Sequence, residues 1–126
     1  MNPSRIATAI GTLLFSTALF AADPPLFKAT NGVLADARGM TVYTYDQDET
    51  GSGKSACVEA CARSWLPVPA GSGALAEPWS AVTRDDGSKQ LAFHGKPLYT
   101  FVNDKKEGDR NGDGIGGAWH LVTVPR

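Results

Sequence analysis

The chain has 126 residues, with 12 basic and 13 acidic side chains and a formal net charge of −1 at neutral pH. It has no stripe of basic side chains of the kind that nucleic-acid binding requires, and no basic amphipathic helix suited to a membrane surface. Its length is enough for one ordinary small domain.

The first 22 residues predict a secretory signal peptide. Arg5 is the only charged residue among them, and an uninterrupted run of apolar and small residues extends from Ile6 to Phe20. Such a pattern is typical of a cleaved export signal, whereas a membrane-spanning helix needs about 20 apolar residues. We expect cleavage after Ala21 or Ala22, which leaves one domain over residues 23–126 without a membrane span. The mature protein is then expected to be periplasmic or secreted.

Strand patterns begin after an extended arm that contains Pro24 and Pro25. A short strand is predicted at residues 33–36 and a longer one at residues 40–46, with a turn between them. Because side chains alternate between the two faces of a strand, Tyr43 and Tyr45 are expected on the same face.

One helix is predicted from Ser55 to Trp65, with the sequence SACVEACARSW. Ser55 is a suitable N-cap residue, and Pro67 ends the helix. Cys57 and Cys61 would lie about 6 Å apart along the helix axis, within reach of a disulfide bond. An even number of cysteines in an oxidising compartment also predicts a disulfide, which here would close only a small loop.

The rest of the chain predicts further strands. A loop rich in proline, glycine and alanine covers residues 68–78, and the segments WSAVTR, DDGS and KQLAFHG then predict a hairpin. KPLYTFVND and, after a glycine-rich loop, AWHLVTVP predict two more strands. The predicted fold class is mainly β or α+β: an antiparallel meander of about six strands with one short helix.

One strand motif occurs twice, because VYTYDQD at residues 42–48 returns as LYTFVND at residues 98–104. The domain is therefore predicted to consist of two related half-repeats, at about 32–69 and 79–125. The aligned motif residues are Tyr43, Tyr45 and Asp48 in the first copy and Tyr99, Phe101 and Asp104 in the second.

The two repeated aspartates have two interpretations. An aspartate that follows a strand commonly accepts hydrogen bonds from backbone N–H groups two residues on, and we expect that structural role here, with the rings packed in the sheet. The alternative is that the two carboxylates converge as ligands or acids beside the phenol rings.

Three segments resemble a known family: YTYDQD, GKSACVEACARSWLPV and GKPLYTFVNDKKEGDRNGDGIGGAWH. They are similar to the bacterial secreted-repeat family, described as predicted lipoproteins with a Yx(FWY)xxD motif, over residues 39–122. The resemblance implies an exported cell-envelope protein of unknown biochemical activity, and a few relatives have a loose association with alkane breakdown. This chain departs from the lipoprotein description because no cysteine follows the apolar run to accept a lipid.

The glycine-rich loop DRNGDGIGG contains a partial calcium-binding pattern. Asp109, Asn111 and Asp113 occupy the first, third and fifth positions of an EF-hand loop, and Gly114 occupies the sixth. Position twelve is His120 in place of a bidentate glutamate, and no helix is predicted before the loop. The loop is thus either a calcium site or a polar turn, since Asn-Gly and Asp-Gly form turns on their own.

The cysteine pair offers a second metal hypothesis. Two thiolates can hold copper together with other ligands, for which the candidates are His94, His120 and Met40. A free thiol pair could also carry out redox chemistry. A structural disulfide is the alternative that an oxidising compartment favours.

An enzyme is the least supported class of protein, because the sequence lacks GxSxG, HExxH, phosphate-loop and dinucleotide-binding motifs. Trp65, Trp79 and Trp119 are expected to anchor the core of a small β domain rather than to stack on sugars. The sequence therefore predicts a small binding or structural module of the cell envelope without a cofactor. Calcium, copper or thiol-redox chemistry is the alternative, and an envelope component or a small ligand is the expected partner.

Overall fold

The computed structural model describes residues 28–30 and 32–124. The predicted signal peptide and the start of the extended arm lie outside these residues. In the part of the chain that the structure describes, no helix is long and apolar enough to cross a membrane.

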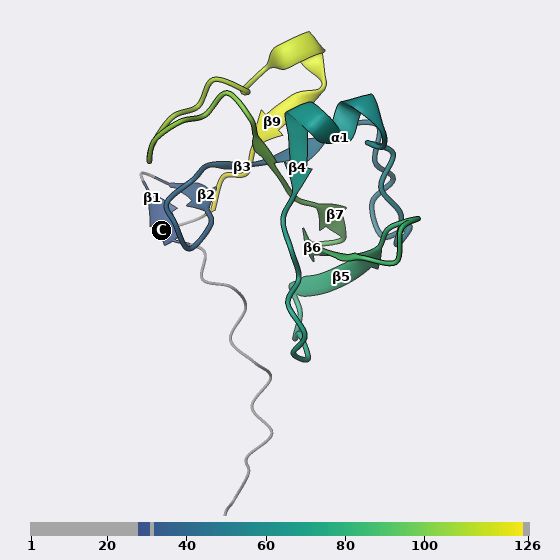
Figure 1. Ribbon diagram of the computed structural model, residues 1–126. Coiled ribbons are helices and arrows are strands. Elements are labelled where there is room, and N and C mark those ends of the chain that lie inside the picture. Colours follow the sequence, from purple (N-terminus) through teal and green to yellow (C-terminus); the bar gives the residue numbers. More distant parts are fainter. Residues whose placement is uncertain (1–27, 31, 125–126) are drawn as a thin grey trace, which may run out of the picture.

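The described residues form a β-rich fold with one short α-helix, as predicted, and Figure 1 shows its arrangement. Within this part of the chain, nine strands build three antiparallel sheets, in the orders β1-β2, β4-β8-β3-β9 and β5-β6-β7. The strands are β1 (Lys28–Thr30), β2 (Val33–Ala35), β3 (Val42–Tyr45), β4 (Trp65–Pro67), β5 (Trp79–Thr83), β6 (Lys89–Phe93), β7 (Lys96–Pro97), β8 (Tyr99–Phe101) and β9 (Trp119–Leu121). The helix α1 spans Ala60–Ser64, and a 3-10 turn, η1, spans Ile115–Gly117.

The strands are shorter and more numerous than the sequence predicted. The single predicted strand KPLYTFVND is divided at Leu98 into β7 and β8. β4 lies where the end of a helix and the start of a loop were predicted. Pro67 disfavours a strand inside a sheet, but β4 lies at the edge of its sheet, where a proline is tolerated.

The central sheet β4-β8-β3-β9 is built by the two halves in alternation. β3 and β8, the two copies of the repeated motif, are neighbours, with Tyr43 opposite Tyr99. The strand next to β8 is β4, from the first half, and the strand next to β3 is β9, from the second half. The halves are therefore related by an approximate twofold axis through the β3–β8 pair, and each half completes the sheet of the other.

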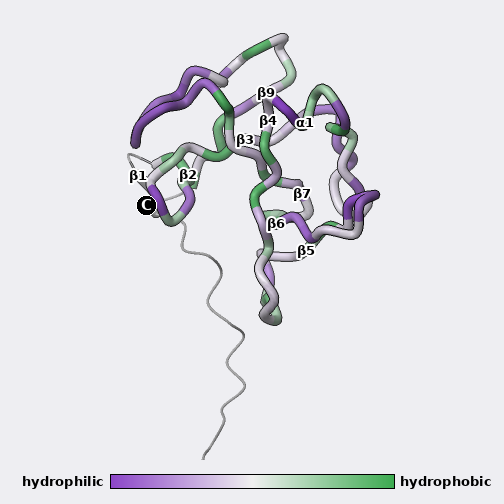
Figure 2. The backbone as a smooth tube through the Cα atoms, viewed as in Figure 1, coloured by the Kyte–Doolittle hydropathy of each residue, from purple (hydrophilic) through white to green (hydrophobic). Residues whose placement is uncertain are grey.

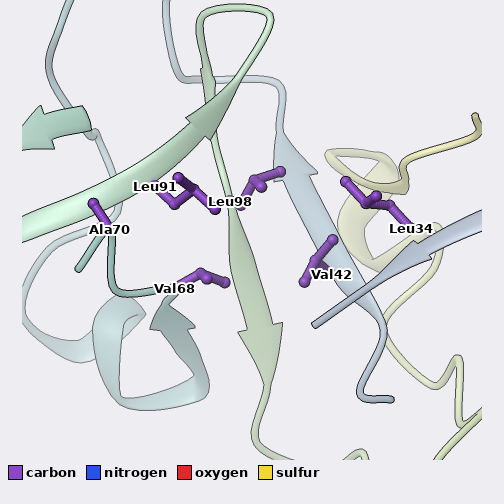
Figure 3. Packing of buried hydrophobic residues seen from close by; sticks show 6 residues of the cluster. All are labelled: Leu34, Val42, Val68, Ala70, Leu91 and Leu98. Atoms are coloured by element: carbon purple, nitrogen blue, oxygen red, sulfur yellow. The ribbon is translucent and has the colours of Figure 1, made fainter. Parts of the chain in front are cut away.

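One face of the central sheet carries an aliphatic core, shown in Figure 3. Val42 and Leu98 belong to the two copies of the repeated motif, and Leu34 from β2 and Leu91 from β6 cover them. The buried cluster consists of Leu34, Val42, Val68, Ala70, Leu91 and Leu98. The hairpins of both halves thus bury the same face of the sheet.

The opposite face carries an aromatic core. Its buried members are Tyr43, Cys57, Trp65, Tyr99, Phe101 and Trp119. Trp65 and Trp119 stack with ring centroids 3.7 Å apart and only 2° between the ring planes. Phe101 stacks on Trp65 at 4.3 Å, and Tyr45 stacks on Trp119 at 4.2 Å. Each half contributes two of these four rings, so the apolar surface that they bury depends on both halves.

Hydrophilic residues concentrate in two of the connections between strands. The segment that leads from β8 to η1 and the turn between β5 and β6 are hydrophilic, whereas hydrophobic residues concentrate near β2 and β4 (Figure 2). The DDGS turn predicted between the two hairpin strands is present, since β5 pairs with β6 from Trp79–Phe93 to Thr83–Lys89.

The helix predicted from Ser55 is wrong in its first half. α1 begins only at Ala60, after Glu59 with a backbone φ of 55°. The N–H of Ala56 donates to Asp48 at 2.6 Å, and Cys57 is buried in the aromatic core. Both contacts need an irregular backbone before α1, so tertiary packing overrides the local helical preference.

Candidate functional site

The tyrosines and aspartates of the repeated motif form crossed pairs between the halves. The hydroxyl of Tyr43 donates to Oδ2 of Asp104 at 2.6 Å, and the hydroxyl of Tyr99 donates to Oδ2 of Asp48 at 2.7 Å. Each tyrosine therefore binds the aspartate of the other half. In the sequence each aspartate stands next to the rings of its own copy, whereas the structure pairs it with the opposite copy.

The second oxygen of each aspartate holds a loop. Oδ1 of Asp48 accepts the N–H of Ala56, eight residues on, and Oδ1 of Asp104 accepts the N–H of Asn111, seven residues on. The expectation of a backbone donor two residues on is wrong, because the carboxylate spans the whole loop in place of a tight turn. Gly112 follows directly and donates to the Tyr43 hydroxyl at 3.1 Å.

Only a glycine fits at position 112. A Cβ atom placed there would lie 2.7 Å from the indole of Trp65 and 3.0 Å from the phenol carbon of Tyr43. The backbone can approach the Tyr43 hydroxyl because no side chain intervenes. This close approach explains a glycine that the sequence alone assigned to a turn or a calcium loop.

Both crossed pairs are withdrawn from water. Asp48 is 5% exposed and Asp104 is 6% exposed, while Tyr43 and Tyr99 are fully buried. Burial, followed by the hydrogen bond to the neighbouring aspartate, raises the pKa of Tyr43 and of Tyr99 well above the usual value of 10.0. The phenols therefore stay protonated and donate to the two aspartates, which ties the two halves together.

A chain of hydrogen bonds continues from Tyr99 to a cation. Arg84 donates to Ser55 Oγ at 2.9 Å, and Ser55 Oγ lies 2.5 Å from the Tyr99 hydroxyl. Since the Tyr99 proton goes to Asp48, Ser55 donates to Tyr99. The chain thus begins at the guanidinium and ends at a carboxylate, so the buried negative charge has a distant positive counterpart.

Arg84 also fixes its surroundings. It donates to Oε1 of Gln90 at 2.8 Å and to the carbonyl of Cys57 at 2.7 Å, and Gln90 in turn donates to the carbonyl of Leu98 at 2.8 Å. Sequence reasoning missed Arg84 and Gln90. The only signal was a polar residue, Gln90, inside an otherwise apolar strand, and that pattern does not reveal which donor it meets.

Cys57 and Cys61 form the predicted disulfide, with their Cα atoms 5.2 Å apart. Cys57 precedes α1 and Cys61 lies within it, so the bridge fastens the start of the helix to the aromatic core. The two sulfur atoms are bonded to each other in this state and are not thiolates.

The glycine-rich loop uses its predicted ligands for internal hydrogen bonds. Oδ2 of Asp109 accepts the N–H groups of Lys105 and Lys106 at 2.8 and 3.1 Å, and these bonds, the first above all, lower the pKa of Asp109. The amide of Asn111 donates to the carbonyl of Asn103, and Asp113 accepts from Leu121, each at 3.4 Å. Among residues 28–30 and 32–124, no three His, Cys, Asp or Glu side chains form a group that could hold a metal ion.

The three further candidates for copper lie on different elements. His94 lies in the turn between β6 and β7, and His120 lies in β9 with its Nε2 atom 2.8 Å from Asp46. Met40 precedes β3, and its N–H donates to Asp36 at 3.0 Å.

A groove of about 590 Å³ lies where the connection between the halves enters the second half, next to the turn between β6 and β7. It is lined by Glu77, Pro78, Trp79, Ser80, His94 and Gly95. The N–H of His94 donates to the carbonyl of Pro78 at 2.8 Å, which joins the two sides of the groove. Phe93 supports both rings, with its centroid 4.8 Å from Trp79 and 4.4 Å from His94. Trp65 and Trp119 are core residues as expected. The half-buried Trp79 also packs against the aliphatic core, and it lines this groove as well.

The crossed pairs and the shared sheet define a duplicated β module whose two halves interlock. The family described as a secreted repeat of unknown function matches residues 26–69 and again residues 80–123. These matches cover well over half of the chain, so the protein belongs to this family. No curated protein and no solved structure matches the chain.

We predict that Tyr43→Phe and Tyr99→Phe each lower the free energy of unfolding by about 1–3 kcal/mol. Each change leaves a buried carboxylate without one of its donors. Urea unfolding followed by far-UV circular dichroism measures the effect. Tyr45→Phe is the matched control, because its ring packs in the same core but belongs to neither pair, and we expect a change below about 0.5 kcal/mol. Equal stability of all three variants would contradict the structural role of the pairs.

Stability is also predicted to fall above about pH 10. The folded state keeps Tyr43 and Tyr99 protonated, because their pKa values are raised, while the unfolded chain loses these protons at the ordinary value. The folded state then binds more protons than the unfolded state, and each tyrosine removes up to about 1.4 kcal/mol per pH unit. Urea unfolding between pH 8 and 11 tests this. Tyr43→Phe must show a shallower alkaline decline than the parent protein, and an unchanged slope would rule the explanation out.

Proposed function

We propose that this protein is an exported binding module of the cell envelope and that its ligand occupies the groove lined by Trp79. The observation that carries the proposal is the groove itself, which is lined by the indole of Trp79 and by three polar side chains, Glu77, Ser80 and His94. Small-molecule sites have this composition, a mostly apolar lining with a few polar groups, and volumes of about 300–1,000 Å³.

The comparison of the two halves supports this location. The features that the halves share, namely the crossed pairs and the stacked rings, are occupied by contacts inside the fold. The groove belongs to what the halves do not share. His94 aligns with Arg38 of the first half, and the preceding glycine-rich connection has no counterpart there.

The lining points to a glycan as the ligand class. An indole offers an apolar surface to the C–H face of a sugar ring, and Glu77, Ser80 and His94 offer hydrogen-bond acceptors and donors to its hydroxyl groups. Glycans of the cell envelope are available to a protein that is periplasmic or secreted. The predicted signal peptide and the family's description as a secreted repeat both support that location.

Fluorine NMR of protein labelled with 5-fluorotryptophan tests the proposal. The chain has three tryptophans, and the Trp79→Phe variant assigns the Trp79 resonance. Titration with a soluble N-acetylglucosamine oligosaccharide is expected to shift the Trp79 resonance and to leave those of Trp65 and Trp119 in place. No shift at millimolar saccharide overturns the glycan proposal. A shift with a short alkane and none with the saccharide would favour the hydrocarbon association instead.

A matched pair of variants adds a second readout. His94→Asn removes the imidazole but suits the left-handed backbone of this position, where φ is 50°. We expect this variant to fold normally and to bind the saccharide at least about threefold more weakly, by the loss of one hydrogen bond. Arg38→Asn, at the aligned position of the first half, is the control and should bind as the parent protein does.

Calcium binding is the alternative, and it gives a different result. The carboxylate of Asp109 already accepts two backbone N–H groups, so the loop has internal partners without an ion. We therefore expect the melting temperature of the mature protein to be the same in EDTA and in added Ca²⁺. A decrease in EDTA that Ca²⁺ reverses, and that Asp113→Asn abolishes, would establish the calcium alternative.

A further inference from the structure

β5 is the outer strand of the sheet β5-β6-β7, and within the described part of the chain one of its edges has no neighbouring strand (Figure 1). The N–H of Arg84, directly after β5, donates to the carbonyl of Ser88, so Arg84 faces β6. Hydrogen-bonded and non-hydrogen-bonded positions alternate along an antiparallel pair. The backbone N–H and C=O groups of Ala81 and Thr83 therefore point away from β6, and both residues are exposed.

The residues opposite Ala81 and Thr83 confirm this direction. Ala81 lies opposite Leu91, and Thr83 lies opposite Lys89. The N–H of Leu91 donates to the segment that follows β4, and the carbonyl of Lys89 accepts an N–H from the same segment, on the far side of β6. The backbone groups of these two pairs are thus directed outward on both sides, and none is used between β5 and β6.

The two edges of the central sheet are closed, in contrast to this one. On the outer side of β4, Pro67 and Pro69 have no N–H, and the N–H of Trp65 donates to the carbonyl at the end of the disulfide loop. Beyond β9, the N–H of Leu34 donates to the carbonyl of Val122. Neither edge therefore presents a row of free donors to another chain.

The side chains of β5 leave its edge accessible. Ser80, Ala81 and Thr83 are exposed, small and uncharged, whereas exposed edges commonly carry lysine, proline or a bulge that hinders pairing. Two N–H groups and two C=O groups stand in a row, with about 7 Å between the two residues that carry them. An extended peptide offers complementary amide groups at this spacing.

The groove and the free edge lie on the same strand. Trp79 and Ser80 line the groove and begin β5, and the outward groups of Ala81 and Thr83 follow directly. A ligand that occupies the groove and carries an extended substituent along β5 therefore places that substituent against the free edge.

The far end of the edge carries a positive charge. Nζ of Lys89 donates to Oγ1 of Thr83 at 2.6 Å. Its ammonium has no carboxylate partner in the part of the chain that the structure describes. The end of β5 away from the groove is thus suited to a carboxylate of the ligand.

We propose that the free edge of β5 binds a short peptide that is attached to the glycan of the groove. The peptide begins at the sugar beside Trp79 and ends with a carboxylate near Lys89. Trp79 and Thr83 are four residue steps apart, or about 13 Å, which an extended peptide of four residues spans. The peptide site rests on the proposed function, because the groove must first hold the glycan.

Two matched saccharides test the peptide site. One is the disaccharide of N-acetylglucosamine and N-acetylmuramic acid, and the other is the same disaccharide with a tetrapeptide on its lactyl group. The Trp79 resonance of protein labelled with 5-fluorotryptophan reports the dissociation constant of each. We expect the peptide-bearing saccharide to bind at least about tenfold more tightly, through two or more additional hydrogen bonds.

Ala81→Pro removes one outward N–H and keeps the ladder between β5 and β6, since proline is tolerated at an edge position whose N–H faces solvent. We expect this variant to bind the peptide-bearing saccharide about tenfold more weakly than the parent protein does, and to bind the plain disaccharide within twofold of it. Ala81→Ser keeps the N–H and is the matched control, which should bind both saccharides as the parent protein does.

Lys89→Gln is the second variant, and it decides the question if Ala81→Pro lacks the near-UV circular dichroism of the parent protein. Its backbone is unchanged and only the ammonium is lost. We expect it to bind the peptide-bearing saccharide at least about threefold more weakly, with unchanged binding of the plain disaccharide.

The outcomes separate the peptide site from the glycan proposal. Equal affinity of the parent protein for the two saccharides overturns the peptide site and leaves the glycan proposal standing. A gain in affinity that the folded variants both retain does the same. No binding of either saccharide at millimolar concentration overturns the glycan proposal, and the peptide site with it.

Discussion

The fold depends on two buried carboxylates and the way each is shared. Asp48 and Asp104 are almost fully withdrawn from water, and a buried charge is tolerated only where hydrogen bonds replace its hydration. Each aspartate uses one oxygen to close the loop that follows it and the other to bind the tyrosine of the opposite half. The loops, the inner strands and the aromatic core are therefore tied to each other at the same two points. Neither half can satisfy its own aspartate alone.

The two halves differ in the segments that donate to the aspartates, whereas the acceptor is an aspartate carboxylate in both. In the first half the Asp48 carboxylate is reached from a disulfide-bonded segment, and Ser55 and Arg84 extend the hydrogen-bond chain to a cation. In the second half the donor beside the tyrosine comes from a glycine-rich loop. The backbone N–H of Gly112 donates to the Tyr43 hydroxyl, as the Ser55 hydroxyl donates to Tyr99. Different local structures thus meet one electrostatic requirement. The groove is free of that requirement, and it has no counterpart in the first half.

Much of this architecture could be predicted from local patterns. The duplication, the β-rich class, the DDGS hairpin and the disulfide follow from spacing, turn residues and the cysteine count. What could not be predicted is non-local. The motif places Asp48 three residues after Tyr45, and nothing in that spacing indicates Tyr99 as its partner. β4 was not predicted because three residues are too few to show an alternating pattern. The first half of the predicted helix was wrong because Cys57 is buried in the aromatic core. Trp79 packs against the aliphatic core as expected, but nothing in its local sequence indicates that it also lines a groove.

The position of β9 has a consequence for the order of events in the life of the chain. β9 pairs with β3, so residues 119–121 complete a sheet that begins at residue 42. The crossed hydrogen bonds likewise close separations of 61 and 51 residues. Contacts this distant give no free energy until nearly the whole polypeptide has been synthesised. The chain therefore cannot complete its central sheet until β9 has been synthesised, so that the joining of the two halves is a late event in the life of the chain.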